Sequence, residues 1–264
     1  MKQNIINKIK IALGLSANIV GIKFLTSSDE YRSFGSKPAK SRLAYCNMVK
    51  LAASGRRLKV EDQHFKCSGA RRAFGFSRDN SAVDSGECHH QMGLYQDRKT
   101  AQKVVKDMAY LDYSVHGMGL FPFENNSEKP DVIIIISNTY TAMRIIQGYS
   151  YHFGITPNIR FVGNQGMCSE LTVRPFLNKD INVSLLCSGT RFLCGWKDSD
   201  IGVAMTSEIC PEVFDGVLET LNPTEPDKKK REIIHEMNAG GLNLDIRPGE
   251  SYYMKKPGNK ISRD

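Results

Sequence analysis

The sequence predicts a mixed α/β protein, with an α+β arrangement as the alternative, built from two related halves. Strand-like and helix-like segments alternate along the chain, and the β-branched run 132–136 has the length and composition of a buried strand. A ten-residue pattern also occurs twice, which indicates an internal repeat. With 264 residues, 41% hydrophobic and 24% charged, the chain suits one large domain or two small ones that pack closely.

In the first half, apolar periodicity and glycine or proline breaks define the expected elements. Helices are expected at 4–13, 46–54, 67–75 and 98–111. Strands are expected at 19–24, 58–60 and 117–123. The polar, glycine-rich segment 77–93 predicts a loop.

In the second half, the unbroken apolar segment DVIIIIS (131–137) predicts a strand inside a parallel sheet that is covered on both faces. Further strands are expected at 159–162, 182–186 and 201–205. Helices are expected at 139–153, 168–177 and 210–221. The charged, glycine- and proline-containing segment after 223 predicts a helix and an extended tail.

The internal repeat is centred on two cysteines. CSGARRAFGF begins at Cys67 and CSGTRFLCGW at Cys187, and both read C-S-G-x-R-x-x-x-G followed by an aromatic residue. Cys46 precedes the first copy and Cys168 the second at a similar distance. We therefore expect two halves related by a pseudo-twofold axis. The predicted divisions are an N-terminal helix (1–17), a first repeat (18–112), a second repeat (131–221) and a C-terminal extension (222–264).

The seven cysteines predict a metal centre. No export signal or membrane-spanning segment is evident, so the chain is expected in the cytoplasm, where structural disulfides are rare. The pseudo-twofold axis would bring together the four predicted ligands, Cys46, Cys67, Cys168 and Cys187. Four thiolates can hold a [4Fe–4S] cluster or a zinc ion, and their dispersed spacing favours the cluster. We expect Cys88, with His89 and His90, in an exposed polar loop, with an accessory metal site as the alternative. Cys194 and Cys210 are expected as buried apolar residues.

Residues around the repeated cysteines predict the surroundings of the centre. Helix N-termini there should lower the pKa of the thiols. The residues expected to neutralise a cluster or bind an anion are Arg71, Arg191, Ser68, Gly69, Ser188 and Gly189. A proton relay is a further hypothesis for Glu61, Asp62 and His64, with a polar loop as the alternative.

Several segments resemble the uncharacterised "domain of unknown function 169" family of archaea and mostly anaerobic bacteria. The resemblance covers about 15–221 and is carried by EDQHFKCSGARRAFG (61–75), PDVIIIISNTYTAMRIIQGYSYHFG (130–154) and VSLLCSGTR (183–191). It implies an anaerobe as the source and cysteine at the four predicted ligand positions. The chain departs from the family pattern at Ser68, where proline is frequent, and in its extended tail. The family supplies no activity to transfer.

The function predicted is that of an iron–sulfur protein in electron transfer or anaerobic redox metabolism. The alternative is a small-molecule-binding module or a zinc-stabilised protein without redox chemistry. A redox partner or a small-molecule substrate is implied, no membrane partner is expected, and a homo-oligomer is compatible with the sequence. The net charge of +8 is weak support for nucleic acid, because its clearest basic run, 228–231, predicts a solvated helix start. No pattern assigns a reaction, so whether the chain is an enzyme is left open.

Overall fold

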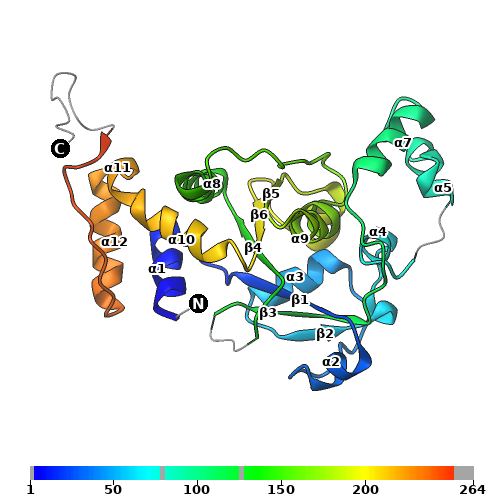
Figure 1. Cartoon of the computed structure of the whole chain (residues 1–264), viewed down its shortest axis with the longest axis horizontal. Helices are drawn as coiled ribbons and strands as arrows, with labels where there is room; N and C mark the ends of the chain where they lie inside the picture. The colour runs from blue at the N-terminus through cyan, green and yellow to red at the C-terminus, as the bar shows by residue number, and fades with distance from the viewer. Residues whose placement is uncertain (1–2, 78–80, 125–127, 253–264) are drawn as a thin grey trace. The chain divides into compact units, whose positions relative to one another are not determined.

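The computed structural model describes residues 3–77, 81–124 and 128–252. The chain forms two compact units, and each combines segments that are distant in sequence (Figure 1). We call them the sheet unit (Ala17–Thr139 and Pro157–Ile209) and the helical unit (Met1–Ser16, Tyr140–Thr156 and Cys210–Asp264). These divisions differ from the predicted repeat boundaries, because the second half contributes to both units.

The sheet unit is built on one six-stranded sheet with the order β2-β3-β1-β4-β6-β5. Its strands are β1 (Val20–Leu25), β2 (Leu58–Val60), β3 (Gly117–Pro122), β4 (Val132–Ser137), β5 (Ile181–Ser184) and β6 (Ile201–Thr206). Every neighbouring pair is antiparallel. The mixed α/β class is therefore confirmed, whereas the expectation of a parallel sheet is wrong. The apolar run in β4 is buried because β4 lies between β1 and β6 at the centre of the sheet.

The strand order reads the same from both edges when β1, β2 and β3 are matched with β4, β5 and β6. The two sets meet at the antiparallel pair of β1 and β4, where Gly21 pairs with Ile133. Two copies of one three-stranded unit would give this order. The duplication itself stays a prediction.

Helices pack on the sheet to form the main core. These helices are α3 (Tyr45–Ala53), α4 (Ser68–Ala73), η2 (Gly166–Val173) and α9 (Arg174–Asn178). Alternate residues of the central strands, such as Ile22 and Ile134, join Met48, Phe74 and Leu171 in one buried cluster. Because successive strand residues point to opposite faces, this cluster lies on one face of the sheet. The helices that carry the repeated cysteines are therefore held on that face.

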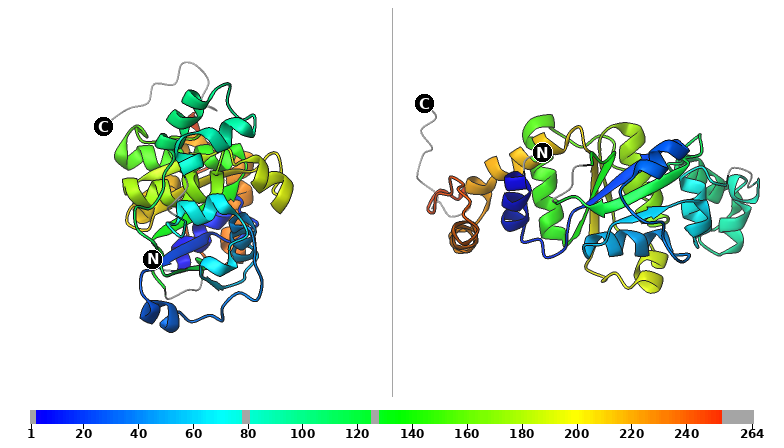
Figure 2. Two further views of the ribbon diagram at one scale, coloured as in Figure 1. Left: turned by 90° about the vertical axis from the view of Figure 1, so that its right-hand side faces the viewer. Right: turned by 90° about the horizontal axis from the view of Figure 1, so that it is seen from below.

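The segment expected to be a loop at 77–93 instead contains two short helices, with 78–80 outside the described residues. The helices α5 (Ser81–Asp84), α6 (Glu87–Gln91) and α7 (Arg98–Asp107) contact one another. They form a small group at one end of the sheet unit (Figures 1 and 2). Gly86 allows this packing, because a Cβ there would lie 2.4 Å from the backbone nitrogen of Gln102.

The expected strand at 159–162 is absent from the described structure, which is a second correction. Side chains, not a neighbouring strand, satisfy the backbone there. The Arg160 nitrogen donates to Asn182 Oδ1 at 2.9 Å, and the Val162 nitrogen donates to Glu170 Oε1 at 2.7 Å. The segment is therefore an irregular loop that is fixed by two buried side chains.

The helical unit consists of α1 (Gln3–Leu13), α8 (Thr139–Phe153), α10 (Cys210–Glu219), α11 (Leu221–Thr224) and α12 (Asp227–Ala239). The predicted N-terminal helix and C-terminal extension share an apolar cluster in which Ala12 joins Ile233 and Met237. The backbones of α8 and α10 approach closely at Gly148, where a Cβ would lie 2.5 Å from the carbonyl oxygen of Val213. Across the described ranges, no helix has the length and apolar character needed to cross a membrane.

Candidate metal centre

A cavity of about 440 Å³ in the sheet unit is lined by five cysteines from five segments of the chain. They are Cys46, Cys67, Cys88, Cys168 and Cys187. All four predicted ligands thus line one cavity, although they are spread over more than half of the chain. All seven cysteines lie in the described residues, and each is a free thiol.

Cys46 lies in the first turn of α3, which is tied to the other cysteine segments. The Tyr45 hydroxyl is 2.9 Å from Thr172 Oγ1 in η2. The Trp196 Nε1–H donates to the carbonyl oxygen of Cys46 at 3.3 Å, and Lys50 Nζ donates to the carbonyl oxygen of Cys194 at 3.0 Å. These bonds hold α3 against both η2 and the segment that follows Cys187.

Thr190 links two of the thiols directly. Its Oγ1 lies 3.1 Å from Cys46 Sγ and 3.1 Å from Cys187 Sγ. Thr190 is fully buried and belongs to η3 (Gly189–Leu193), the short helix that follows Cys187. One hydroxyl therefore bridges a cysteine of the first predicted repeat and a cysteine of the second.

Cys168 is buried within η2, and both η2 and η3 are π-helices. This helix type is rare and is found frequently at functional sites. The residues before the two cysteine segments, Gln165 and Leu186, have φ values of +54° and +66°. Such values are uncommon outside glycine and cost energy that the surroundings must offset. The backbone is thus unusual on both sides of the thiol cluster.

Glu170 fixes the loops around η2. Its carboxylate accepts hydrogen bonds from the backbone nitrogens of Val162 and Gly163 and from the Ser184 hydroxyl. Asn182 adds to this support by donating to the Glu170 carbonyl oxygen at 2.8 Å. Burial raises the pKa of Glu170, and these donors act in the opposite direction. No sequence pattern predicts this role of Glu170, because it depends on contacts with Val162, Gly163 and Ser184 in other segments.

Cys67 is exposed and immediately precedes α4. The Arg71 guanidinium donates to both carboxylate oxygens of Asp62, at 2.6 and 2.8 Å. Glu61 and His64 form a reciprocal capping box around η1 (Asp62–His64). None of these four neighbours of Cys67 lines the cavity. They form hydrogen bonds with one another beside α4, and the proton relay stays a hypothesis.

The other predicted neighbours divide into two groups. Those that line the cavity are Ser68, Gly69, Ser188 and Gly189. Arg191 instead donates to three backbone carbonyls, those of Leu185, Lys197 and Asp200. It therefore closes η3 onto the ends of β5 and β6. The arginine that does line the cavity is Arg72, which sequence reasoning missed.

The thiols influence one another electrostatically. Burial raises the pKa of Cys168, and the neighbouring Cys67 and Cys187 raise it further. A hydrogen bond to Cys194, then burial, raises the pKa of Cys46, with smaller contributions from Cys168 and Cys187. The expected lowering by helix N-termini is therefore wrong for these two thiols, because burial and crowding dominate. A bound cation would reverse this balance, because it stabilises thiolates.

Cys88 and Cys194, which are not among the four predicted ligands, lie closer to those ligands than the sequence predicts. Cys88 is in α6 and lines the cavity, so the exposed-loop prediction is wrong for it. Cys194 is buried and hydrogen-bonded to Cys46, which lowers the pKa of Cys194 to about 7. Cys210 is buried in α10, as expected.

Donor spacing bears on both metal hypotheses. Within the described ranges, no three His, Cys, Asp or Glu side chains are grouped closely enough to hold one metal ion. A zinc ion needs all of its thiolates at about 2.3 Å from one point. In a cluster each thiolate binds a separate iron, so the sulfurs surround a larger core. The four thiols line one cavity but are not grouped as a ready-made ligand set in the described residues, so their spacing does not favour either metal.

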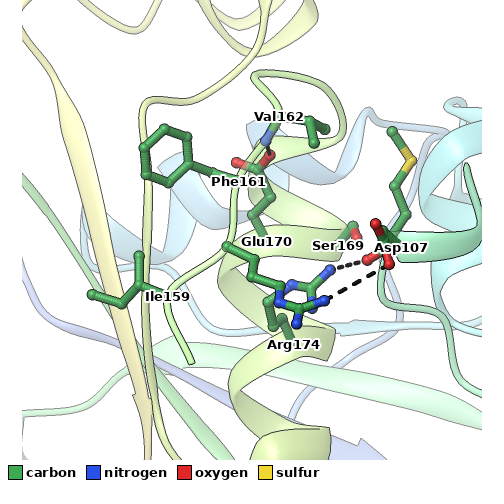
Figure 3. A pocket seen from close by; sticks show the side chains of 9 residues that line it. Asp107, Ile159, Phe161, Val162, Ser169, Glu170 and Arg174 are labelled. Carbon is green, nitrogen blue, oxygen red and sulfur yellow. Dashed lines mark hydrogen bonds and ion pairs between the residues drawn. The ribbon is translucent and has the colours of Figure 1, made fainter. Parts of the chain in front are cut away.

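A second cavity, of about 600 Å³, also borders η2 (Figure 3). Ser169, Glu170 and Arg174 contribute to it from η2 and α9, and Asp107 from the end of α7. Figure 3 shows the Glu170 carboxylate turned to the backbone of Val162, as the hydrogen bond requires. Val162 lines both cavities, so one loop separates them.

The fold and the cavity define a mixed α/β protein with an antiparallel sheet and a thiol cluster beside paired π-helices. Residues 8–216 match the DUF169 family, described as uncharacterised ArCR proteins, and the chain belongs to that family. It is 24% identical over 206 residues to an uncharacterized protein of Methanocaldococcus jannaschii, which covers 77% of this chain and 88% of that protein. No solved structure matches the chain. The resemblance seen in the sequence is thereby confirmed.

Proposed function

We propose that the chain is an iron–sulfur protein whose cluster is held by Cys46, Cys67, Cys168 and Cys187. The observation that carries the proposal is the convergence of these four thiols on one cavity. Pairwise effects on thiol pKa connect Cys46 and Cys168 with Cys67 and Cys187, and Cys194 also acts on Cys46. Four cysteine thiolates are the usual ligands of a [4Fe–4S] cluster.

At Cys46 and Cys168 the surroundings support metal ligands over reactive thiols, whereas the pKa of the adjacent Cys194 is lowered. A nucleophilic cysteine needs a lowered pKa, whereas burial and neighbouring sulfurs keep Cys168 and Cys46 protonated in the metal-free protein. Gly69 and Gly189 line the cavity without side chains and let the backbone approach a bulky inorganic core. When bound, the cluster would supply one-electron redox chemistry, and the Thr190 hydroxyl would donate one hydrogen bond, to the thiolate of Cys46 or of Cys187.

The biological role that follows is electron transfer or a redox step in metabolism. Zinc stabilisation is the weaker alternative, because the four cysteines are dispersed along the chain and do not form the close sequence pairs of small zinc modules. A small-molecule-binding role is supported separately by polar side chains that line the same cavity, namely Arg72, His89 and Gln165.

Single cysteine-to-serine substitutions test the ligand assignment. Cys46→Ser, Cys67→Ser, Cys168→Ser and Cys187→Ser should each lose or destabilise the iron bound after anaerobic reconstitution. Cys88→Ser is the matched control inside the cavity, and Cys210→Ser is the control outside it. Cys194→Ser should also retain iron. Full iron binding by all four ligand variants would refute the assignment.

A further inference from the structure

Three buried polar atoms beside the thiols have no hydrogen-bond partner among the described residues. They are Arg72 Nε, His89 Nδ1 and Gln165 Oε1, and all three residues line the thiol cavity. An unpaired buried polar atom costs roughly 1–3 kcal/mol, so such atoms call for an explanation. All three atoms belong to residues of the cavity wall, and a polar ligand in the cavity would supply their missing partners.

Arg72 presents a cation whose remaining contacts hold it in place. Its guanidinium forms an ion pair with Asp84 and lies 4.5 Å above the Tyr110 ring. The side chain is only 13% exposed. These contacts leave the Nε–H as a preorganised donor, and arginine is well suited to bind carboxylate.

Gln165 and His89 add two more fixed positions. The Gln165 amide packs against Gly69 and lies with Nε2 3.5 Å from the Tyr110 hydroxyl. Whichever way this amide is turned, one of its polar ends lacks a partner. His89 is 6% exposed, and burial and Arg72 lower its pKa, so the imidazole is neutral at pH 7. A neutral imidazole can donate or accept one hydrogen bond on the cavity side.

The remaining wall is largely apolar, with contributions from Val83, Leu94, Met167 and Leu193. A single arginine beside such a wall suits one carboxylate on an apolar carbon skeleton. The cavity, about 440 Å³, is within the range of small-molecule sites.

We propose that the thiol cavity binds a small organic monocarboxylate, with its carboxylate on Arg72 and His89 and a further polar group on Gln165. This names a substrate class for the cluster site and, in that sense, rests on the proposed function. The chain offers matched controls, because the neighbouring Arg71 and His90 are bonded elsewhere and do not line the cavity.

Isothermal titration of the full chain with butyrate and benzoate, and with inorganic phosphate for comparison, tests the inference. Butyrate or benzoate should bind, and Arg72→Gln should weaken binding by roughly tenfold or more while Arg71→Gln leaves it unchanged. His89→Asn against His90→Asn gives a second comparison that does not disturb the Arg72–Asp84 pair.

Three results would overturn the proposal. They are no carboxylate binding at millimolar concentrations, equal binding by the Arg72 and His89 variants and their controls, and binding of phosphate alone. Iron is measured in the same samples, so the two proposals can fail separately. Carboxylate binding by a chain that never takes up iron would uphold the site and refute the cluster. Iron uptake without carboxylate binding would uphold the cluster and refute the carboxylate site.

Discussion

Gly166 at the start of η2 packs directly on the backbone of Leu186, so that a Cβ on Gly166 would lie 2.8 Å from Leu186 Cα. Cys168 lies two residues after Gly166, and Cys187 comes directly after Leu186. The close approach therefore sets the separation of two proposed ligands. It also explains why the chain adopts positive φ at Gln165 and Leu186 beside this contact.

Gly166→Ala should consequently disturb the centre. The added methyl group must push η2 away from Leu186, at a cost of roughly 1–3 kcal/mol in the free energy of unfolding. Iron should also be bound more weakly after anaerobic reconstitution. Gly35→Ala is the control, because a Cβ there meets only Arg57 Nη2 at 4.0 Å. Equal iron binding and stability in both variants would show that the contact does not set the ligand geometry.

Thr190→Val should shift the reduction potential of the proposed cluster to more negative values. The variant removes the hydroxyl that lies 3.1 Å from both Cys46 Sγ and Cys187 Sγ, and hydrogen bonds to sulfur raise the potential. The loss of about 1 kcal/mol corresponds to tens of millivolts for one electron. Thr190→Ser keeps the hydroxyl and should keep the potential, which a redox titration followed by electron paramagnetic resonance would measure. A potential unchanged by valine would exclude this role of Thr190.

His89 should make stability depend on pH. The folded-state pKa of His89 is lowered by burial and by Arg72, so the unfolded chain binds the proton more readily. Stability should be complete above the unfolded pKa of about 6.5 and should fall as pH decreases toward the folded value. His89→Asn should flatten this part of the pH profile in chemical denaturation, whereas His90→Asn should not. Parallel profiles for both variants would contradict the prediction.

The stability of the helical unit should depend on the buried ion pair of Arg144 and Glu225. Their side chains are 2% and 1% exposed, and Arg144 Nε lies 3.0 Å from Glu225 Oε1. Arg144→Gln removes the buried cation and leaves only the partly exposed Lys229 near the carboxylate, which should cost about 3–5 kcal/mol. Lys229→Gln is the control, because Lys229 is 30% exposed and lies 3.7 Å from the same carboxylate. Urea denaturation that gives similar values for both variants would contradict the expectation.

The sequence predicted the elements that local patterns determine. The periodicity of 139–153 matches α8, and the apolar run after Pro130 matches β4. The apolar residues at 159–162 were misleading because Asn182 and Glu170 satisfy their backbone from other segments. Whether β4 runs parallel or antiparallel depends on its neighbours β1 and β6, so its own amino-acid composition does not predict the direction. The π-helices likewise depend on packing around Cys168 and Thr190, which no periodicity reveals.

The repeated C-S-G-x-R pattern located the cavity because it marks both Cys67 and Cys187. It misplaced the arginine, since Arg71 pairs with Asp62 and the next residue, Arg72, lines the cavity. A helix turns by about 100° per residue, so neighbouring residues point in different directions. Which of the two faces the cavity depends on how α4 packs. The directions of the His89 side chain in α6 and of the Gln165 side chain before η2 likewise depend on packing.

Iron and acid-labile sulfide analysis of the anaerobically purified full chain, with its absorption spectrum, tests the central claim most directly. A cluster held by four cysteines predicts a brown protein with about four irons and four sulfides per chain and a broad band near about 400 nm. A colourless protein that takes up no iron or sulfide on anaerobic reconstitution would contradict it. One zinc per chain without sulfide would also contradict it, and would assign the four thiols to a structural metal site.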